Sequence, residues 1–197
     1  MNLVSVVINA VIFLVTLVFV TGFFRRDGKW DPEKGKAAFR YFTCQSNAFC
    51  AAAALLTGLS GLSGGIPGWI WTLKYMATAA VTVTMMTVLL FLGRIYGYRG
   101  LLKGPDLFMH LLTPLLALFS FCAAEKRGMS FATAALGMLP VMLYGALYLY
   151  RTVLAPEKKR WDDFYAFNRN GKWPVSLAAM LAGTLLICLG IMALQNL

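Results

Sequence analysis

Six stretches of this chain contain no Asp, Glu, Lys or Arg, and each is long enough to hold a helix that crosses a membrane. A transmembrane helix needs about 20 mostly apolar residues. Only 13% of the 197 residues are charged, whereas a soluble domain carries about 25%. The charge-free stretches are 1–24, 41–73, 75–93, 107–124, 128–150 and 173–197.

The stretch 41–73 exceeds one span, but glycine and proline gather in its second half, which is typical of a turn. We therefore predict an all-α membrane protein, a single domain over residues 1–197 that forms a six-transmembrane-helix bundle. The first helix lacks the basic start and the small-residue cleavage site of a signal peptide, so we interpret it as retained. The predicted helices span about 3–24, 40–60, 69–96, 106–124, 130–151 and 174–195.

The basic residues predict the orientation of this bundle. All but three of the 18 Lys and Arg residues lie in the loops after the first, third and fifth predicted helices. The positive-inside rule puts these loops in the cytoplasm and both termini on the outer side. The compact chain and its short loops favour a bacterial inner membrane. Lys74, near the outer end of the third helix, is expected to snorkel to the surface.

The net charge of +10 also bears on partners. Basic residues beside a membrane attract anionic headgroups, so the charge indicates a lipid partner and no nucleic acid. We predict no metal and no cofactor. The four cysteines lie within predicted spans at spacings that suggest neither zinc nor disulfides, and one histidine cannot supply two axial haem ligands.

Polar side chains are densest at the start of the second predicted helix. Thr43, Ser46 and Asn47 share one helical face, whereas Gln45 points elsewhere. Such residues commonly join membrane helices through hydrogen bonds. Because polar groups inside a span are costly, the cluster is also a candidate functional site.

The only histidine, His110, begins the fourth predicted helix, with Asp106 one turn before it and Pro114 one turn after. Proline has no N–H, so the carbonyl of His110 is expected to lose its helical partner. Freed backbone at this depth should face protein or a wet cavity.

The two features are predicted to lie at the same depth. Thr43 follows Arg40 by three residues and His110 follows Asp106 by four, which puts both roughly 5–6 Å beyond a charged entry residue. A hydroxyl and an imidazole that meet in one bundle allow nucleophilic catalysis, with His110 as general base and Thr43 as nucleophile.

The other polar residues receive supporting roles in this hypothesis. Asp106 is a candidate to orient the imidazole or to cap its helix. The oxyanion candidates are Ser46, Asn47 and Gln45. Cys44 is a rival nucleophile because thiolates are intrinsically stronger, but it points about 100° away from Thr43 on a helix.

Two segments carry a resemblance to a known family. Residues 39–47 read Phe-Arg-Tyr-Phe-Thr-Cys-Gln-Ser-Asn and residues 107–116 read Leu-Phe-Met-His-Leu-Leu-Thr-Pro-Leu-Leu. Together they resemble the androgen-induced protein family, which includes the androgen-dependent TFPI-regulating protein and bacterial relatives. The resemblance implies a multi-span membrane protein that hydrolyses fatty acid esters of hydroxy fatty acids through an intramembrane threonine and histidine. These match Thr43 and His110. Residues 164–174 depart from the Tyr-Pro-rich stretch of the bacterial relatives.

The sequence thus favours an intramembrane hydrolase of lipid esters, whose acyl-ester substrate enters from the bilayer. Two alternatives stay open. The first is a small membrane transporter or channel, in which transport would survive the substitution Thr43→Ala. The chain shows no internal repeat of the kind that transporters use. In a non-catalytic lipid-binding protein, Thr43 and His110 would only join two helices.

Overall fold

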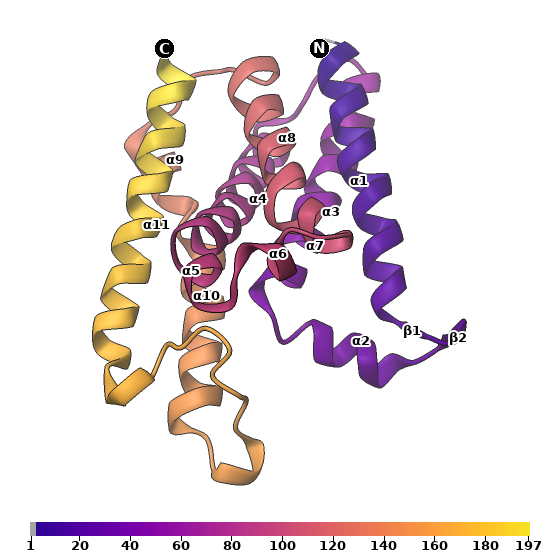
Figure 1. The fold of residues 1–197 in the computed structure, drawn as a ribbon. Helices are drawn as coiled ribbons and strands as arrows, with labels where there is room; N and C mark the ends of the chain where they lie inside the picture. The colour runs from indigo at the N-terminus through magenta and orange to yellow at the C-terminus, as the bar shows by residue number, and fades with distance from the viewer. Residues whose placement is uncertain (1–2) are drawn as a thin grey trace.

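The computed structural model describes residues 3–197, which form a bundle of long helices (Figure 1). Five helical segments are long and apolar enough to cross a membrane, and each has at least 20 residues, the length that the hydrocarbon core requires. This is the architecture of an integral membrane protein. The five segments are Leu3–Phe23, Gly68–Tyr96, Pro105–Ala124, Phe131–Leu154 and Trp173–Asn196.

The remaining predicted span, the second along the chain (40–60), corresponds to α3 (Phe42–Leu62). It is as long as α1 (Leu3–Phe23), with 21 residues each, but it is not among the five apolar segments. Gln45 and Asn47 lower its hydropathy. Helix α3 packs against α1 and α4 (Gly68–Thr87), so its polar groups face protein, where membrane helices place them.

The six predicted ranges overlap these segments and α3, with ends that differ by up to three residues. Several segments contain π-helical turns between regular stretches. The second segment runs from α4 through η1 (Val88–Leu92) into α5 (Gly93–Tyr96), and α6 (Tyr98–Leu101) follows. The third comprises α7 (Pro105–Leu107), η2 (Phe108–Leu112), α8 (Thr113–Phe119) and η3 (Ser120–Ala124). The fourth comprises α9 (Phe131–Leu136), α10 (Leu139–Leu149) and η4 (Tyr150–Leu154). The loop that follows contains two short 3₁₀ turns, η5 (Glu157–Lys159) and η6 (Arg169–Gly171). The fifth segment is α11 (Trp173–Asn196).

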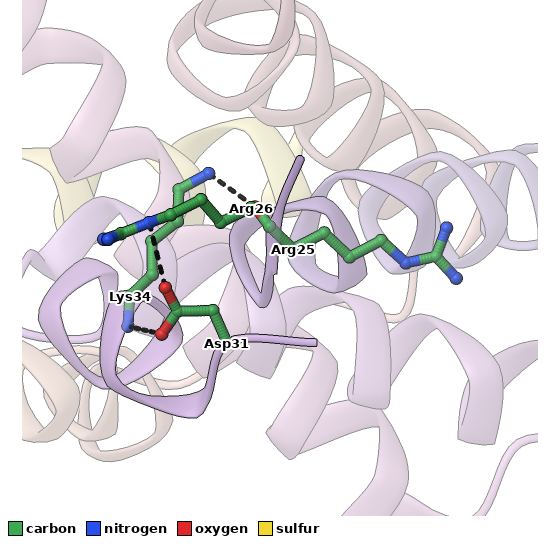
Figure 2. A network of polar contacts seen from close by, with 4 residues as sticks. All are labelled: Arg25, Arg26, Asp31 and Lys34. Atoms are coloured by element: carbon green, nitrogen blue, oxygen red, sulfur yellow. Dashed lines mark hydrogen bonds and ion pairs between the residues drawn. The ribbon is translucent and has the colours of Figure 1, made fainter. Parts of the chain in front are cut away.

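A small hairpin and a short helix connect α1 to α3. Asp31 caps the helix by accepting from the backbone N of Lys34 at 3.0 Å, and it pairs with Arg26 Nε, also at 3.0 Å (Figure 2). Lys34 Nζ donates to the carbonyl of Arg25, whose own guanidinium points away from the group. The segment comprises β1 (Arg25–Arg26), β2 (Lys29–Trp30) and α2 (Pro32–Ala38).

Helix α4 lies at the centre of the bundle, between α1 and α3 on one side and α10 and α11 on the other (Figure 1). Its middle turns contain small residues that are completely buried, among them Ala77, Ala79 and Ala80. Small side chains let neighbouring helices approach closely, which favours packing inside a membrane. The start of α1 and the end of α11 lie at the same end of the bundle (Figure 1).

The expectation that Lys74 reaches the surface is wrong, because its side chain is completely buried. Lys74 Nζ donates to Asn9 Oδ1, and Asn9 Nδ2 donates to Glu125 Oε1 at 2.6 Å. The hydroxyls of Ser5 and Ser120 also donate to Glu125 Oε1, at 2.7 and 2.6 Å. These five residues form what we call the Asn9 network. It joins α1, α4 and η3 through polar groups that could not be left unpaired at this depth.

Replacement of Asn9 by Ala should therefore destabilise the bundle strongly. It leaves a buried amino group and a buried carboxyl group without the amide between them, a change that typically costs about 3–5 kcal/mol. Val7→Ala, on the exposed face of the same helix, is the matched control. Thermal unfolding in detergent should show a large fall in Tm for Asn9→Ala and a small one for Val7→Ala. Equal shifts would contradict a stabilising role for the network.

Candidate functional site

Thr43 lies in the first turn of α3 and is half-buried. The helix begins at Phe42, whose backbone N–H donates to the hydroxyl of Tyr165 at 2.9 Å. Because the first N–H groups of a helix have no partner within it, Tyr165 satisfies one of them. Tyr165 belongs to the loop between α10 and α11, so this loop fixes the turn that carries Thr43.

His110 lies in the π-helical turn η2 and is 7% exposed. The N–H of Thr113 donates to Phe108 rather than to Met109, the partner of a regular α-helix. In the π register the next donor for Met109 would be Pro114, which has no N–H. The freed carbonyl is thus that of Met109, whereas the sequence predicted that of His110.

Asn47 provides a hydrogen-bond donor for the free carbonyl of Met109. Its Nδ2 donates to Met109 O at 3.0 Å and to Thr43 O at 2.9 Å. One amide group therefore bonds the turn of Thr43 to the residue before His110. Asn47 is completely buried, and its Oδ1 has no hydrogen-bond partner among residues 3–197.

The side chains of Thr43 and His110 meet. Thr43 Oγ1 lies 3.4 Å from His110 Nε2, and the other ring nitrogen, Nδ1, lies 2.7 Å from the carbonyl of Leu101. A carbonyl can only accept, so Nδ1 carries the proton and donates to Leu101. In the neutral ring Nε2 is then an acceptor that faces the hydroxyl of Thr43. This is the arrangement that a general base requires, and such contacts are often long in unliganded sites.

Both side chains lie on the wall of a cavity of about 450 Å³. Its walls are mostly apolar or aromatic, with Thr43, His110 and Asp106 among the polar groups. A cavity of this size and lining suits part of an acyl chain beside a few polar groups. The other lining residues are Phe23, Ala38, Tyr41, Cys44, Leu92, Tyr96, Leu101, Met109, Phe164 and Tyr165.

The remaining predicted residues are placed differently. Ser46 bonds to Thr43 O at 3.2 Å and to the hydroxyl of Thr84 at 2.9 Å, which links α3 to α4. Gln45 donates to Phe39 O at 2.8 Å. Asp106 shares the cavity wall, but the group that orients the imidazole is the carbonyl of Leu101. Cys44 also reaches the cavity wall.

Sequence reasoning did not single out two contributors to this site. The Leu101 carbonyl leaves no trace in the sequence, because any residue has a backbone carbonyl. Tyr165 lies in a loop far from both motifs, and burial raises its pKa to about 12. Its hydroxyl therefore keeps its proton at neutral pH. Within residues 3–197, no group of three or more His, Cys, Asp or Glu could hold a metal ion.

Comparison with known proteins yields no relatives: no family model, no curated protein and no solved structure matches the chain.

The hydrogen bond to Leu101 predicts the tautomer of His110. Because His110 is the only histidine, labelling the protein with ¹⁵N-histidine gives signals from one ring. At alkaline pH, Nδ1 should show the shift of a protonated nitrogen and Nε2 that of an unprotonated one. A free histidine in the same detergent buffer is the reference. A proton on Nε2 would contradict the assigned geometry.

Proposed function

We propose that this protein is an intramembrane hydrolase of lipid esters, with Thr43 as the nucleophile and His110 as the general base. The observation that carries the proposal is the approach of Thr43 Oγ1 to His110 Nε2 within a largely apolar cavity. A hydroxyl becomes an effective nucleophile when an adjacent base removes its proton. The Leu101 carbonyl leaves Nε2 free to do so.

The reaction follows from these two groups. His110 Nε2 accepts the hydroxyl proton while Thr43 Oγ1 attacks the ester carbonyl, and a tetrahedral oxyanion forms. The alcohol leaves with the proton from the imidazolium, and the acyl group stays on Thr43 as an ester. Water, deprotonated by His110, then attacks the acyl carbon. The bond from that carbon to Thr43 Oγ1 breaks, His110 returns the proton to Oγ1, and the fatty acid is released.

The oxyanion requires donors near Thr43. In this proposal the protonated hydroxyl of Tyr165 is the donor, and the N-terminus of α3 adds its partial positive charge. The partial positive charge of a helix N-terminus stabilises developing negative charge. Both groups lie at the start of the helix whose first turn carries the nucleophile.

The substrate class comes from the cavity lining and from the resemblance to the androgen-induced protein family. The apolar walls suit the acyl chain of a fatty acid ester of a hydroxy fatty acid, or of a similar acyl ester. In this proposal the chain crosses a bacterial inner membrane six times, with α3 as the second span. Both termini are outside, and the basic loops bind anionic headgroups in the cytoplasm.

Single substitutions test this mechanism. Thr43→Ala removes the nucleophile and His110→Ala removes the base, so each should lower lipid-ester hydrolysis by roughly 10²–10⁴-fold. Labelling by a fluorophosphonate probe in detergent should be lost in both. Thr57→Val is the matched control, because Thr57 is a buried threonine of the same helix whose hydroxyl bonds to Ala53 O.

Folding of all variants would be checked by gel filtration. A Thr43→Ala variant that is labelled as strongly as the parent would exclude Thr43 as the nucleophile. Cys44→Ala would then test the neighbouring thiol on the cavity wall.

The pH dependence provides a second test. A protonated Nε2 cannot accept the hydroxyl proton, so hydrolysis should decline as the pH is lowered from roughly 8 to roughly 5. The rate of ester hydrolysis would be measured at constant ionic strength. A flat profile over this range would contradict His110 as the base.

One observation favours a second candidate. The 3.4 Å separation of Thr43 Oγ1 from His110 Nε2 exceeds the usual O–H···N length, so the two groups also fit a non-catalytic lipid-binding protein. In that case lipid would copurify with the protein, and Thr43→Ala would alter stability without a catalytic defect.

A further inference from the structure

A second cavity, of about 520 Å³, lies beside the first turns of α3. It is formed by the end of α2 and the residues after it, by the end of the fourth apolar segment, and by the start of the loop that follows. These elements lie at the end of the bundle opposite the start of α1 (Figure 1). The two cavities have no lining residue in common.

The lining of this cavity is strongly basic. Six of its ten lining residues are Lys or Arg, and none is Asp or Glu. Like charges gathered around one hollow repel each other unless acidic groups or a ligand intervene. Of the six, Lys36 has a carboxylate partner, since its Nζ lies 2.7 Å from Glu33. The six are Lys36, Arg40, Arg151, Lys158, Lys159 and Arg160.

Arg151 shows that the cavity is more than a set of mobile surface charges. Its guanidinium lies 5.7 Å from the ring centroid of Trp161, and its carbonyl accepts from the backbone N of Trp161 at 2.9 Å. Its Nε is buried, yet it has no hydrogen-bond partner among residues 3–197. An unpaired charged donor is costly, so the guanidinium lacks a countercharge, which an anion in the cavity would supply.

A second arginine is also held in place. Arg160 Nε donates to the carbonyl of Ala155 at 2.9 Å, which leaves the two terminal nitrogens of its guanidinium for another acceptor. Arginine presents paired donors in a planar fork that matches the oxygens of phosphate, and such charge-assisted hydrogen bonds are the strong ones.

We propose that this cavity is a binding site for a phosphate-bearing anion. A phosphate group carries enough negative charge to relieve the repulsion among several cations, and it offers several acceptors to the Arg151 and Arg160 donors. The positive-inside rule accounts for basic residues at this end of the protein. It does not account for their convergence on one cavity, because Arg25, Arg94 and Lys103 do not line it. The site is independent of the proposed hydrolase activity.

The phosphate could belong to a lipid headgroup or to a free metabolite, and one experiment distinguishes these sources. The full chain in detergent would be titrated with inorganic pyrophosphate and, separately, with a short-chain phosphatidylglycerol. Binding would be measured by the change in Tm and by calorimetry at matched ionic strength. Short-chain phosphatidylcholine, whose headgroup carries a phosphate but no net charge, is the reference.

The variant Arg151→Gln with Lys159→Gln removes one arginine and one lysine from the cavity. The control, Arg25→Gln with Lys103→Gln, removes the same charge from exposed positions elsewhere. Lys158→Gln with Lys159→Gln alters only exposed side chains, so it keeps the test valid if the loss of Arg151 disturbs folding.

The parent and the control should bind at least one probe, and the cavity variants should bind it about tenfold or more weakly, as expected for lost charged hydrogen bonds. Binding of pyrophosphate would identify a soluble anion as sufficient, whereas binding of phosphatidylglycerol alone would identify a lipid headgroup. Equal weakening in the cavity variants and the control would overturn the proposal in favour of a general electrostatic field. Failure of the parent to bind either probe would overturn it as well.

Discussion

The packing of the bundle depends on a buried polar contact among Lys74, Asn9 and Glu125. Asn9 stands between the amino group of Lys74 and the carboxyl group of Glu125, and all three are almost completely buried. Each group alone would face a large desolvation penalty. Because the amide accepts from one and donates to the other, α1 can dock against α4 and the end of the third apolar segment in only one register. That register sets the depth of every other residue along these helices.

A second constraint positions the candidate site. Pro114 cannot donate to the backbone, and the helix around His110 adopts a π-helical turn. The carbonyl of Met109 that this leaves free is taken by Asn47, which also bonds to Thr43 O. The π-helical turn thus has a structural role, because the free carbonyl of Met109 accepts the hydrogen bond that joins α3 to the helix containing His110. π-Helical turns are frequent at functional sites, and here the reason is visible in the hydrogen bonds.

The helix ranges were predictable because the absence of charge over about 20 residues is a strong signal. The matching depth of Thr43 and His110 was predicted by counting residues from the charged entry positions. Their contact also depends on how α3 packs against η2, which the count does not give. The burial of Lys74 was not predictable, because its partners Asn9 and Glu125 come from distant parts of the chain. The hydrogen bond from His110 to the Leu101 carbonyl was not predictable either, because every residue has a backbone carbonyl. The convergence of Arg151 and Arg160 on one cavity depends on the path of a loop, which hydropathy does not describe.

The loop between α10 and α11 contributes to both cavities, and its anchoring explains how an apolar site and a basic site can lie so near each other. Arg160 and Trp161 face the basic cavity, whereas Phe164 and Tyr165 line the cavity of Thr43. Between these pairs, Asp163 accepts from Tyr148 and from two backbone N–H groups of the loop. A packed cluster of aromatic rings surrounds this anchor. Members of this cluster line both cavities, Trp161 the basic one and Phe164 and Tyr165 the largely apolar one, so a single loop borders two cavities of opposite polarity.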